Sequence, residues 1–227
     1  CDEHDLSPSH VVGRPAALAM HVDGEPRLVH GIVSRFVHSD AGKTRTEYKV
    51  TLVPLMWRMR LRTDSRIFQG LTVPEILADV LDRAGFLRAD RQAREQGEGV
   101  VISGYQMALG NTYRARENCV QYRESDWDFA SRLMEEEGIH CFFEHGESSH
   151  RLVISDSPTR HEPLAGGDAI AFRPGSGAMA AGEHVSRFQF AEEVRPARVV
   201  VSDYSFERPM LPLSAAAQTD GNGMFEM

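Results

Sequence analysis

Residues 119–145, CVQYRESDWDFASRLMEEEGIHCFFEH, contain the most complete set of local structural signals in the 227-residue chain. They predict a helix from Asp126 to Glu137, because Ser125 can serve as its N-cap and Gly138 can end it. Apolar residues three and four positions apart predict one buried helix face, made of Phe129, Ala130, Leu133 and Met134.

A second helix is predicted upstream, from Thr72 to Ala84. Thr72 and Glu75 have the spacing of a capping box, and Gly85 supplies the stop. Pro74 lies in the first turn, where its missing amide hydrogen costs little. The buried face of this helix is expected to contain Ile76, Leu77, Val80 and Leu81.

Most of the remaining ordered sequence is typical of antiparallel strands. Residues 28–40 and 44–54 predict one hairpin, which should end at Pro54 because proline cannot donate to a strand ladder. Residues 139–144 and 151–155 predict another hairpin, and ARVVVSDYSF at 197–206 predicts a further strand. The sequence therefore predicts an α+β fold that is mostly antiparallel β.

Four segments carry weaker patterns. Residues 87–99 are rich in charge and predict a solvated connection, and a Gly, Ala and Pro-rich link after Pro158 indicates a domain boundary. HVSRFQF at 184–190 resembles HGIVSRFVH at 30–38, which suggests the repeat of a strand in two related β modules. The small, polar residues 214–227 are expected to fray.

Composition excludes several classes of protein. Hydrophobic residues at 41% and charged residues at 26% are typical of a folded domain. The net charge of −8 disfavours nucleic acid as a partner. Three scattered cysteines give neither a disulfide framework nor a CxxC metal motif. We found no signal peptide, membrane-spanning run or nucleotide-binding motif, so no cofactor is predicted.

Two groups of side chains could in principle carry chemistry. The acidic residues Asp128, Glu135, Glu136 and Glu137 could serve a hydrolase, but capping explains the first and the other three are spread around a helix. His140, Cys141, His145 and His150 could bind zinc, but adjacent residues of a strand face opposite ways. We therefore predict neither a catalytic nor a metal site, and interpret the chain as a protein that is not an enzyme.

The segments at 64–77 (DSRIFQGLTVPEIL), 119–145 and 199–209 (VVVSDYSFERP) closely resemble the VgrG family, the valine-glycine repeat spike proteins of bacterial type VI secretion systems. Shorter matches in the same order extend the resemblance from Leu28 to Pro212. The resemblance implies a fold similar to a phage tail baseplate hub, with two β-barrel-like modules and a small α/β insertion. The corresponding expected domains are an incomplete first barrel module at 1–62, the insertion with two helices and a hairpin at 63–158, and part of a second barrel module at 159–227.

The family motif is matched by a set of residues to which the resemblance gives an architectural role. Phe68, Trp127 and Phe129 are expected to pack the insertion onto a barrel, and Arg123 and Arg132 to form ion pairs with the neighbouring acidic residues. No matching residue is expected to be catalytic or to bind a cofactor or metal. The full set is Arg66, Phe68, Gln69, Gln121, Tyr122, Arg123, Glu124, Trp127, Phe129, Arg132, Glu136 and Gly138.

The resemblance also implies partners and a location. It implies a homotrimer that contacts a hexameric tube ring protein and baseplate proteins, without a small-molecule substrate. A tip protein and effectors would bind a distal half that this short sequence lacks. The protein would fold in the bacterial cytoplasm and leave through the secretion machine. The alternatives are the hub of a contractile phage tail or related injection particle, a cell-wall hydrolase that uses Glu135, Glu136 or Asp128, and an adaptor that loads toxins.

Overall fold

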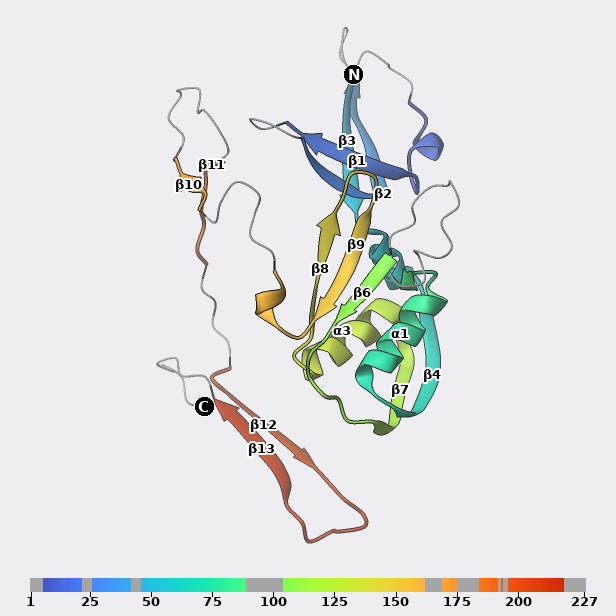
Figure 1. Ribbon diagram of the computed structural model, residues 1–227, viewed down its shortest axis with the longest axis vertical. Helices are drawn as coiled ribbons and strands as arrows, with labels where there is room; N and C mark the ends of the chain where they lie inside the picture. Colours follow the sequence, from blue (N-terminus) through green and yellow to red (C-terminus); the bar gives the residue numbers. More distant parts are fainter. Residues whose placement is uncertain are drawn as a thin grey trace. The chain divides into compact units, whose positions relative to one another are not determined.

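The computed structural model describes residues 6–21, 26–41, 46–88, 104–161, 169–174, 184–191, 193 and 196–218. These residues form two compact units, the larger containing the described residues up to Ile170 and the smaller those from Ala171 onward. Most neighbouring strands pair antiparallel, and the described chain has few helices (Figure 1). The predicted α+β, mostly antiparallel fold class is therefore confirmed.

The larger unit begins with a three-stranded antiparallel sheet in the order β1-β2-β3. Its elements are η1 (Pro8–His10), β1 (Pro15–Met20), β2 (Arg27–Ala41) and β3 (Thr46–Val53). Strands β2 and β3 confirm the first predicted hairpin, and β3 ends directly before Pro54 as expected. The short 3-10 helix η2 (Leu55–Leu61) that follows was not predicted.

Both predicted helices are present, as α1 (Val73–Arg83) and α3 (Asp126–Glu136). The backbone N–H of Thr72 donates to Glu75 Oε2 over 2.8 Å, which is half of the predicted capping box. Ser125 Oγ accepts from the backbone N–H of Asp128 over 3.1 Å, as an N-cap does. All eight residues predicted to form the two apolar faces are buried.

A long two-stranded ribbon and a four-stranded sheet complete the larger unit. The ribbon pairs β4 (Thr63–Leu71) with β7 (Arg116–Ser125). The sheet has the order β5-β6-β9-β8, with β5 (Leu87–Arg88), β6 (Gly104–Ala108), β8 (His140–His145) and β9 (His150–Ser155). Strands β8 and β9 confirm the second predicted hairpin, whereas β4 and β7 were not predicted. Of the predicted connection 87–99, Leu87–Arg88 is a strand and the rest lies outside the described residues.

The main core lies where these elements meet. Helices α1 and α3 contact each other, α1 also contacts β4, and α3 contacts both β7 and η2 (Figure 1). Buried side chains come from every one of these elements, for example Met59, Ile76 and Phe129. The core therefore joins segments that are distant in sequence and holds the ribbon against both helices.

The smaller unit contains two strand pairs, and η3 (Pro158–Arg160) precedes it in the chain. Strands β10 (Ala171–Phe172) and β11 (His184–Val185) pair parallel, and β12 (Arg198–Asp203) pairs antiparallel with β13 (Leu213–Gln218). Strand β12 confirms the predicted strand at 197–206. The predicted fraying is wrong for residues 214–218, because their backbone pairs with β12, and 219–227 lie outside the described residues. The proposed repeat of 30–38 at 184–190 stays a hypothesis.

Helix α3 ends in a Schellman motif at Gly138. The N–H of Gly138 donates to the carbonyl of Glu135 over 3.3 Å, and that of Ile139 to the carbonyl of Met134 over 2.8 Å. Gly138 has φ +67°, a conformation that costs other residues free energy because of their Cβ atom.

We expect Gly138→Ala to lower the free energy of unfolding by about 1–2 kcal/mol. A Cβ at this position would meet no atom within 4 Å, so the loss would be conformational rather than steric. Gly138→Asn should lower the free energy of unfolding less than Gly138→Ala does, because asparagine tolerates this backbone conformation. Urea unfolding measures these differences. The control is Gly110→Ala, whose added Cβ would make only an ordinary contact with Asp156 Oδ1 at 3.9 Å; an equal loss in both alanine variants would contradict the argument.

Candidate functional site

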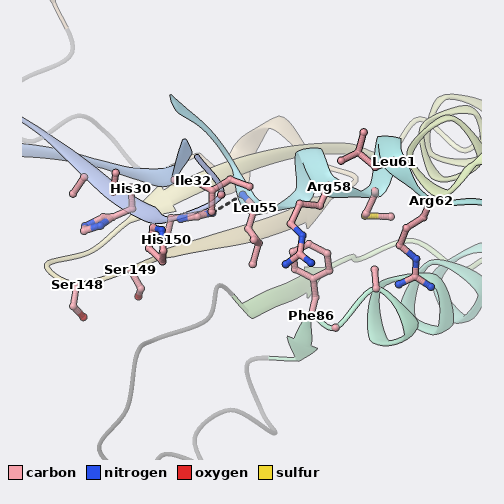
Figure 2. A pocket seen from close by; sticks show the side chains of 18 residues that line it. His30, Ile32, Leu55, Arg58, Leu61, Arg62, Phe86, Ser148, Ser149 and His150 are labelled. Carbon is pink, nitrogen blue, oxygen red and sulfur yellow. Dashed lines mark hydrogen bonds between the residues drawn. The ribbon is translucent and has the colours of Figure 1, made fainter. Parts of the chain in front are cut away.

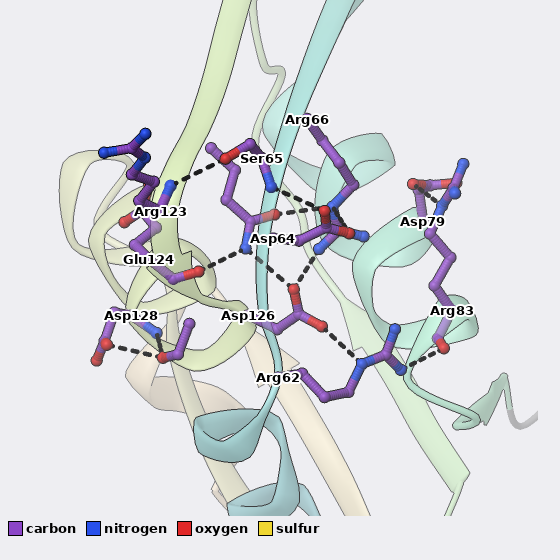
Figure 3. A network of polar contacts seen from close by, with 12 residues as sticks. Arg62, Asp64, Ser65, Arg66, Asp79, Arg83, Arg123, Glu124, Asp126 and Asp128 are labelled. Carbon is purple, nitrogen blue, oxygen red and sulfur yellow. Dashed lines mark hydrogen bonds and ion pairs between the residues drawn. The ribbon is translucent and has the colours of Figure 1, made fainter.

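A buried charge, Asp126, lies among the residues of the family motif at the first position of α3. Its side chain is only 1% exposed. The guanidinium of Arg66, from β4, donates through Nη2 to Asp126 Oδ1 (Figure 3). Arg62 Nε lies 3.3 Å from Asp126 Oδ2. The carboxylate therefore faces two cations from a neighbouring segment, as a buried charge requires.

Gln121 completes this network from β7. Its Oε1 accepts from Arg66 Nε over 2.8 Å, and its Nε2 donates to Asp126 Oδ1 over 3.0 Å and to the carbonyl of Glu124 over 3.1 Å. Gln121 is fully buried. Three elements, β4, β7 and α3, are thus connected by one polar cluster, which we call the Asp126 network: Arg62, Arg66, Gln121 and Asp126.

A second cluster links the outer side of α3 to β7. Arg132 Nη2 donates to Glu124 Oε1 over 2.8 Å and to the carbonyl of Val120 over 2.7 Å. The hydrogen bond with Glu124 raises the pKa of Arg132. Arg116 binds Glu136 and Glu137 over 2.7 and 2.8 Å. The predicted ion pairs of Arg132 are therefore present in the structure.

The motif aromatics take different positions around α3. Phe68 of β4 and Phe129 of α3 are both buried and stack with ring centroids 5.6 Å apart. Trp127 is half-buried and lies under the guanidinium of Arg60 from η2, 5.6 Å from its centroid. Phe68 and Phe129 thus join ribbon to helix, and Trp127 joins helix to η2.

The outer face of the β4–β7 ribbon carries the exposed part of the motif. Gln69 Nε2 donates to Asn118 Oδ1 over 3.0 Å across the ribbon. Tyr122 is 65% exposed, and the Arg123 guanidinium stacks on its ring at 5.2 Å. Among the described residues, Arg123 does not form the predicted ion pair. Arg123 has φ +52° at a bulge opposite Asp64 and Ser65, and its N–H donates to Ser65 Oγ over 3.2 Å. The bulge interrupts the alternation of buried and exposed residues along β7.

The structure also contains site residues that sequence reasoning missed. From the sequence, Asp126 was only the first residue of the predicted helix, and Arg62 and Arg116 were not singled out. The available signal was the position of Asp126 inside the motif, but its burial depends on Arg66, 60 positions away.

The two alternative groups of side chains are dispersed by the fold. Asp128 accepts a hydrogen bond from Ser125 Oγ over 2.7 Å, and Glu136 pairs with Arg116. His140 stacks with His161 near one end of β8, and His145 faces His150 at the other end. Among the residues that the structure describes, no three His, Cys, Asp or Glu side chains are placed to hold a metal ion.

A pocket of about 840 Å³ lies in the larger unit, between the β1–β3 sheet, η2 and the loop of the β8–β9 hairpin (Figure 2). Ile32, Leu55 and Phe86 contribute apolar surface, and Arg58 and His150 contribute nitrogen atoms. None of the described residues that line it is acidic. In the described part of the chain, no helix has both the length and the apolar character to cross a membrane.

Comparison with known proteins yields relatives over nearly the whole chain. It is 36% identical to the type VI secretion system spike protein VgrG1c of Pseudomonas aeruginosa over 88% of this chain and 25% of that protein. It is 39% identical to VgrG4b of the same organism over 89% of this chain and 23% of that protein. The actin cross-linking toxin VgrG1 of Vibrio cholerae is 34% identical over 90% of this chain and 17% of that protein. The chain thus spans a quarter or less of each of these relatives.

A solved structure supports the fold. The c3393 protein of Escherichia coli, described as a component of the type VI secretion system with structural similarity to the T4 bacteriophage tail proteins gp27 and gp5, matches with a TM-score of 0.59 and 21% identity. The match covers 91% of this chain and 47% of that one. The model of the phage tail baseplate hub (GPD) family matches residues 1–226. The chain therefore belongs to the phage tail baseplate hub (GPD) family.

Proposed function

We propose that this chain forms the hub part of a type VI secretion spike, in which it joins the tube of stacked rings to a membrane-puncturing needle and takes part in effector delivery. The observation that carries the proposal is the family match over residues 1–226, together with relatives that are type VI spike proteins at 34–39% identity. These relatives favour a secretion spike over the hub of a phage tail.

The Asp126 network supports a purely architectural motif. Its buried carboxylate is paired with Arg62 and Arg66 inside the fold. Two carboxylates of the alternative hydrolase set also have partners: Asp128 accepts from Ser125, and Glu136 pairs with Arg116. We therefore propose that the chain is not an enzyme and uses no cofactor or metal. The motif residues from Arg66 to Gly138 would keep the insertion, residues 63–158, rigid between a first hub module at 1–62 and part of a second at 159–227.

Exposed apolar strands support assembly with other chains. Val199, Val200 and Val201 of β12 are 56%, 53% and 64% exposed, so apolar groups point out of both faces of the β12–β13 pair. Ile67 and Tyr122 are likewise exposed on the β4–β7 ribbon. Apolar patches of this kind mark interaction sites in soluble proteins. The proposed partners are two further copies in a homotrimer, a hexameric tube ring protein and baseplate proteins. A tip protein and effectors would bind distal parts of a longer spike.

The test of assembly is the mass of the chain in solution. We expect a species of three times 25.3 kDa, about 76 kDa, by light scattering over a concentration series. Cross-linking with and without the tube ring protein would identify a contact between the two. A monomer at every concentration that also fails to bind the ring protein would contradict the proposed hub role of this part of the chain.

The test of function is secretion. In the source bacterium, loss of the gene should stop release of the tube ring protein into the medium, and the intact gene should restore it. The protein itself should fold in the cytoplasm and appear outside the cell only when the machine is active. Release of phage-like particles in place of ring-protein secretion would favour the phage tail hub instead.

A further inference from the structure

Three histidines meet where the β1–β3 sheet touches the end of the β8–β9 hairpin. His30 comes from β2, and His145 and His150 are opposite each other in the register of β8 and β9. The His30 and His145 rings stack with centroids 6.2 Å apart, and the His145 and His150 rings are 5.7 Å apart. Figure 2 shows His30 and His150 beside the pocket that lies next to this junction. We call these three residues the histidine joint.

The hydrogen bonds of the joint require two neutral rings. The backbone N–H of His30 donates to Nδ1 of His145 over 3.1 Å. The backbone N–H of Leu55 donates to Nε2 of His150 over 3.4 Å (Figure 2). Each accepting nitrogen must hold a free lone pair, and a protonated imidazole has none. His30 completes the joint through its Nε2, which donates to the carbonyl of Gly146 over 2.9 Å.

The surroundings oppose a positive charge on either ring. Burial first, and then the neighbouring His145 and His30, lower the pKa of His150 to about 4. Burial and the neighbouring His30 also lower the pKa of His145. The pocket lining adds two cations, Arg58 of η2 and Arg62 directly after it, the second of which pairs with Asp126. The lining residues of β1 carry no charge. On the hairpin, Glu144 is paired with Arg151, and Glu147 of the loop is exposed to solvent.

We propose that the histidine joint is an acid-sensitive hinge: protonation of His145 and His150 breaks both backbone hydrogen bonds and releases the hairpin end from the β1–β3 sheet and η2. The sheet stays attached through the chain that runs from β3 into η2, so the released state is open rather than dissociated. The direction follows from proton binding, because the open state, with histidines near their ordinary pKa of 6.5, binds more protons than the closed one. The joint is therefore fully closed above about pH 6.5 and weakens as the pH falls toward 4.

The experiment is hydrogen exchange of the full chain between pH 7.5 and 4.5, corrected for the intrinsic effect of pH. A single histidine with a pKa of about 4 when closed and 6.5 when open predicts that opening becomes on the order of 25-fold more favourable between pH 7.5 and 5. Protection of the His30 and Leu55 amides should fall by this factor. Amides in α1, which do not contact the joint, provide the internal control and should keep their protection.

The matched variant is H145N/H150Q, whose amide oxygens accept the same hydrogen bonds but do not titrate in this range. We expect its protection at His30 and Leu55 to be independent of pH. Equal pH dependence in wild type and variant, or unchanged protection in wild type at pH 4.5, would overturn the hinge. If the variant does not fold, an NMR titration of the wild-type rings decides: a His150 pKa well below 6.5 supports the proposal, and one at or above 6.5 overturns it.

Discussion

Asp126→Ala is expected to lower the free energy of unfolding by about 3–5 kcal/mol, because it removes the buried carboxylate that pairs with Arg66 and leaves this charge only a longer contact, 3.5 Å, with the exposed Asp64. The Arg66 side chain is only 12% exposed, so water cannot replace the lost carboxylate. Gln121 would lose one of its partners in the same step. Urea unfolding followed by tryptophan fluorescence measures the change, because Trp57 and Trp127 both belong to the larger unit.

Two further variants separate the buried charge from other effects. Asp79→Ala removes a partner from the exposed Arg83 pair on α1, where the two atoms are 2.7 Å apart, and should change the stability little. The double variant Arg66→Met with Asp126→Leu removes both charges together, so it should lower the free energy of unfolding less than Asp126→Ala does. Arg66 is also not fully satisfied in the native protein, because its Nη1 lacks a hydrogen bond among the described residues. A double variant that is no more stable than the single one would show that the loss does not come from an unpaired charge.

Helix α3 could be predicted in detail because its determinants are close together in the chain. Ser125, Gly138 and the spacing of Phe129 and Leu133 fall within fourteen consecutive residues, and the structure has the helix within one residue of the predicted end. Hairpin β8–β9 was found for the same reason. Local sequence therefore fixed the elements whose hydrogen bonds close within a short segment.

Strands β4 and β7 could not be predicted in this way. Arg66 pairs with Gln121, which lies 55 positions further along the chain, so neither strand has a local partner. The bulge at Arg123 also breaks the alternation by which a half-buried strand is recognised. The burial of Asp126 could not be predicted for a related reason: it depends on Arg66 of β4, which is distant in sequence. The motif resemblance identified Arg66 and Gln121 but gave no sign that they meet around Asp126.

The second large effect is expected at the aromatic stack. Phe129→Ala should lower the free energy of unfolding by about 3–5 kcal/mol, because Phe129 is fully buried and its removal opens a cavity next to Phe68. Phe129→Leu keeps most of the side-chain volume and should lower the free energy of unfolding by less than about 1.5 kcal/mol. The same urea and fluorescence experiment measures both.

Tyr122→Ala is the control that relates stability to assembly. Tyr122 also belongs to the family motif, but it is 65% exposed on the outer face of the ribbon. Tyr122→Ala should leave the free energy of unfolding of the isolated chain nearly unchanged, whereas Phe129→Ala should lower it strongly. If both motif residues instead have equal effects on unfolding, the ribbon face is part of the folded core and cannot be the surface that meets another chain. If Tyr122→Ala weakens only the proposed trimer, the motif has two separable roles, with Phe129 holding α3 in place and Tyr122 serving the contact between chains.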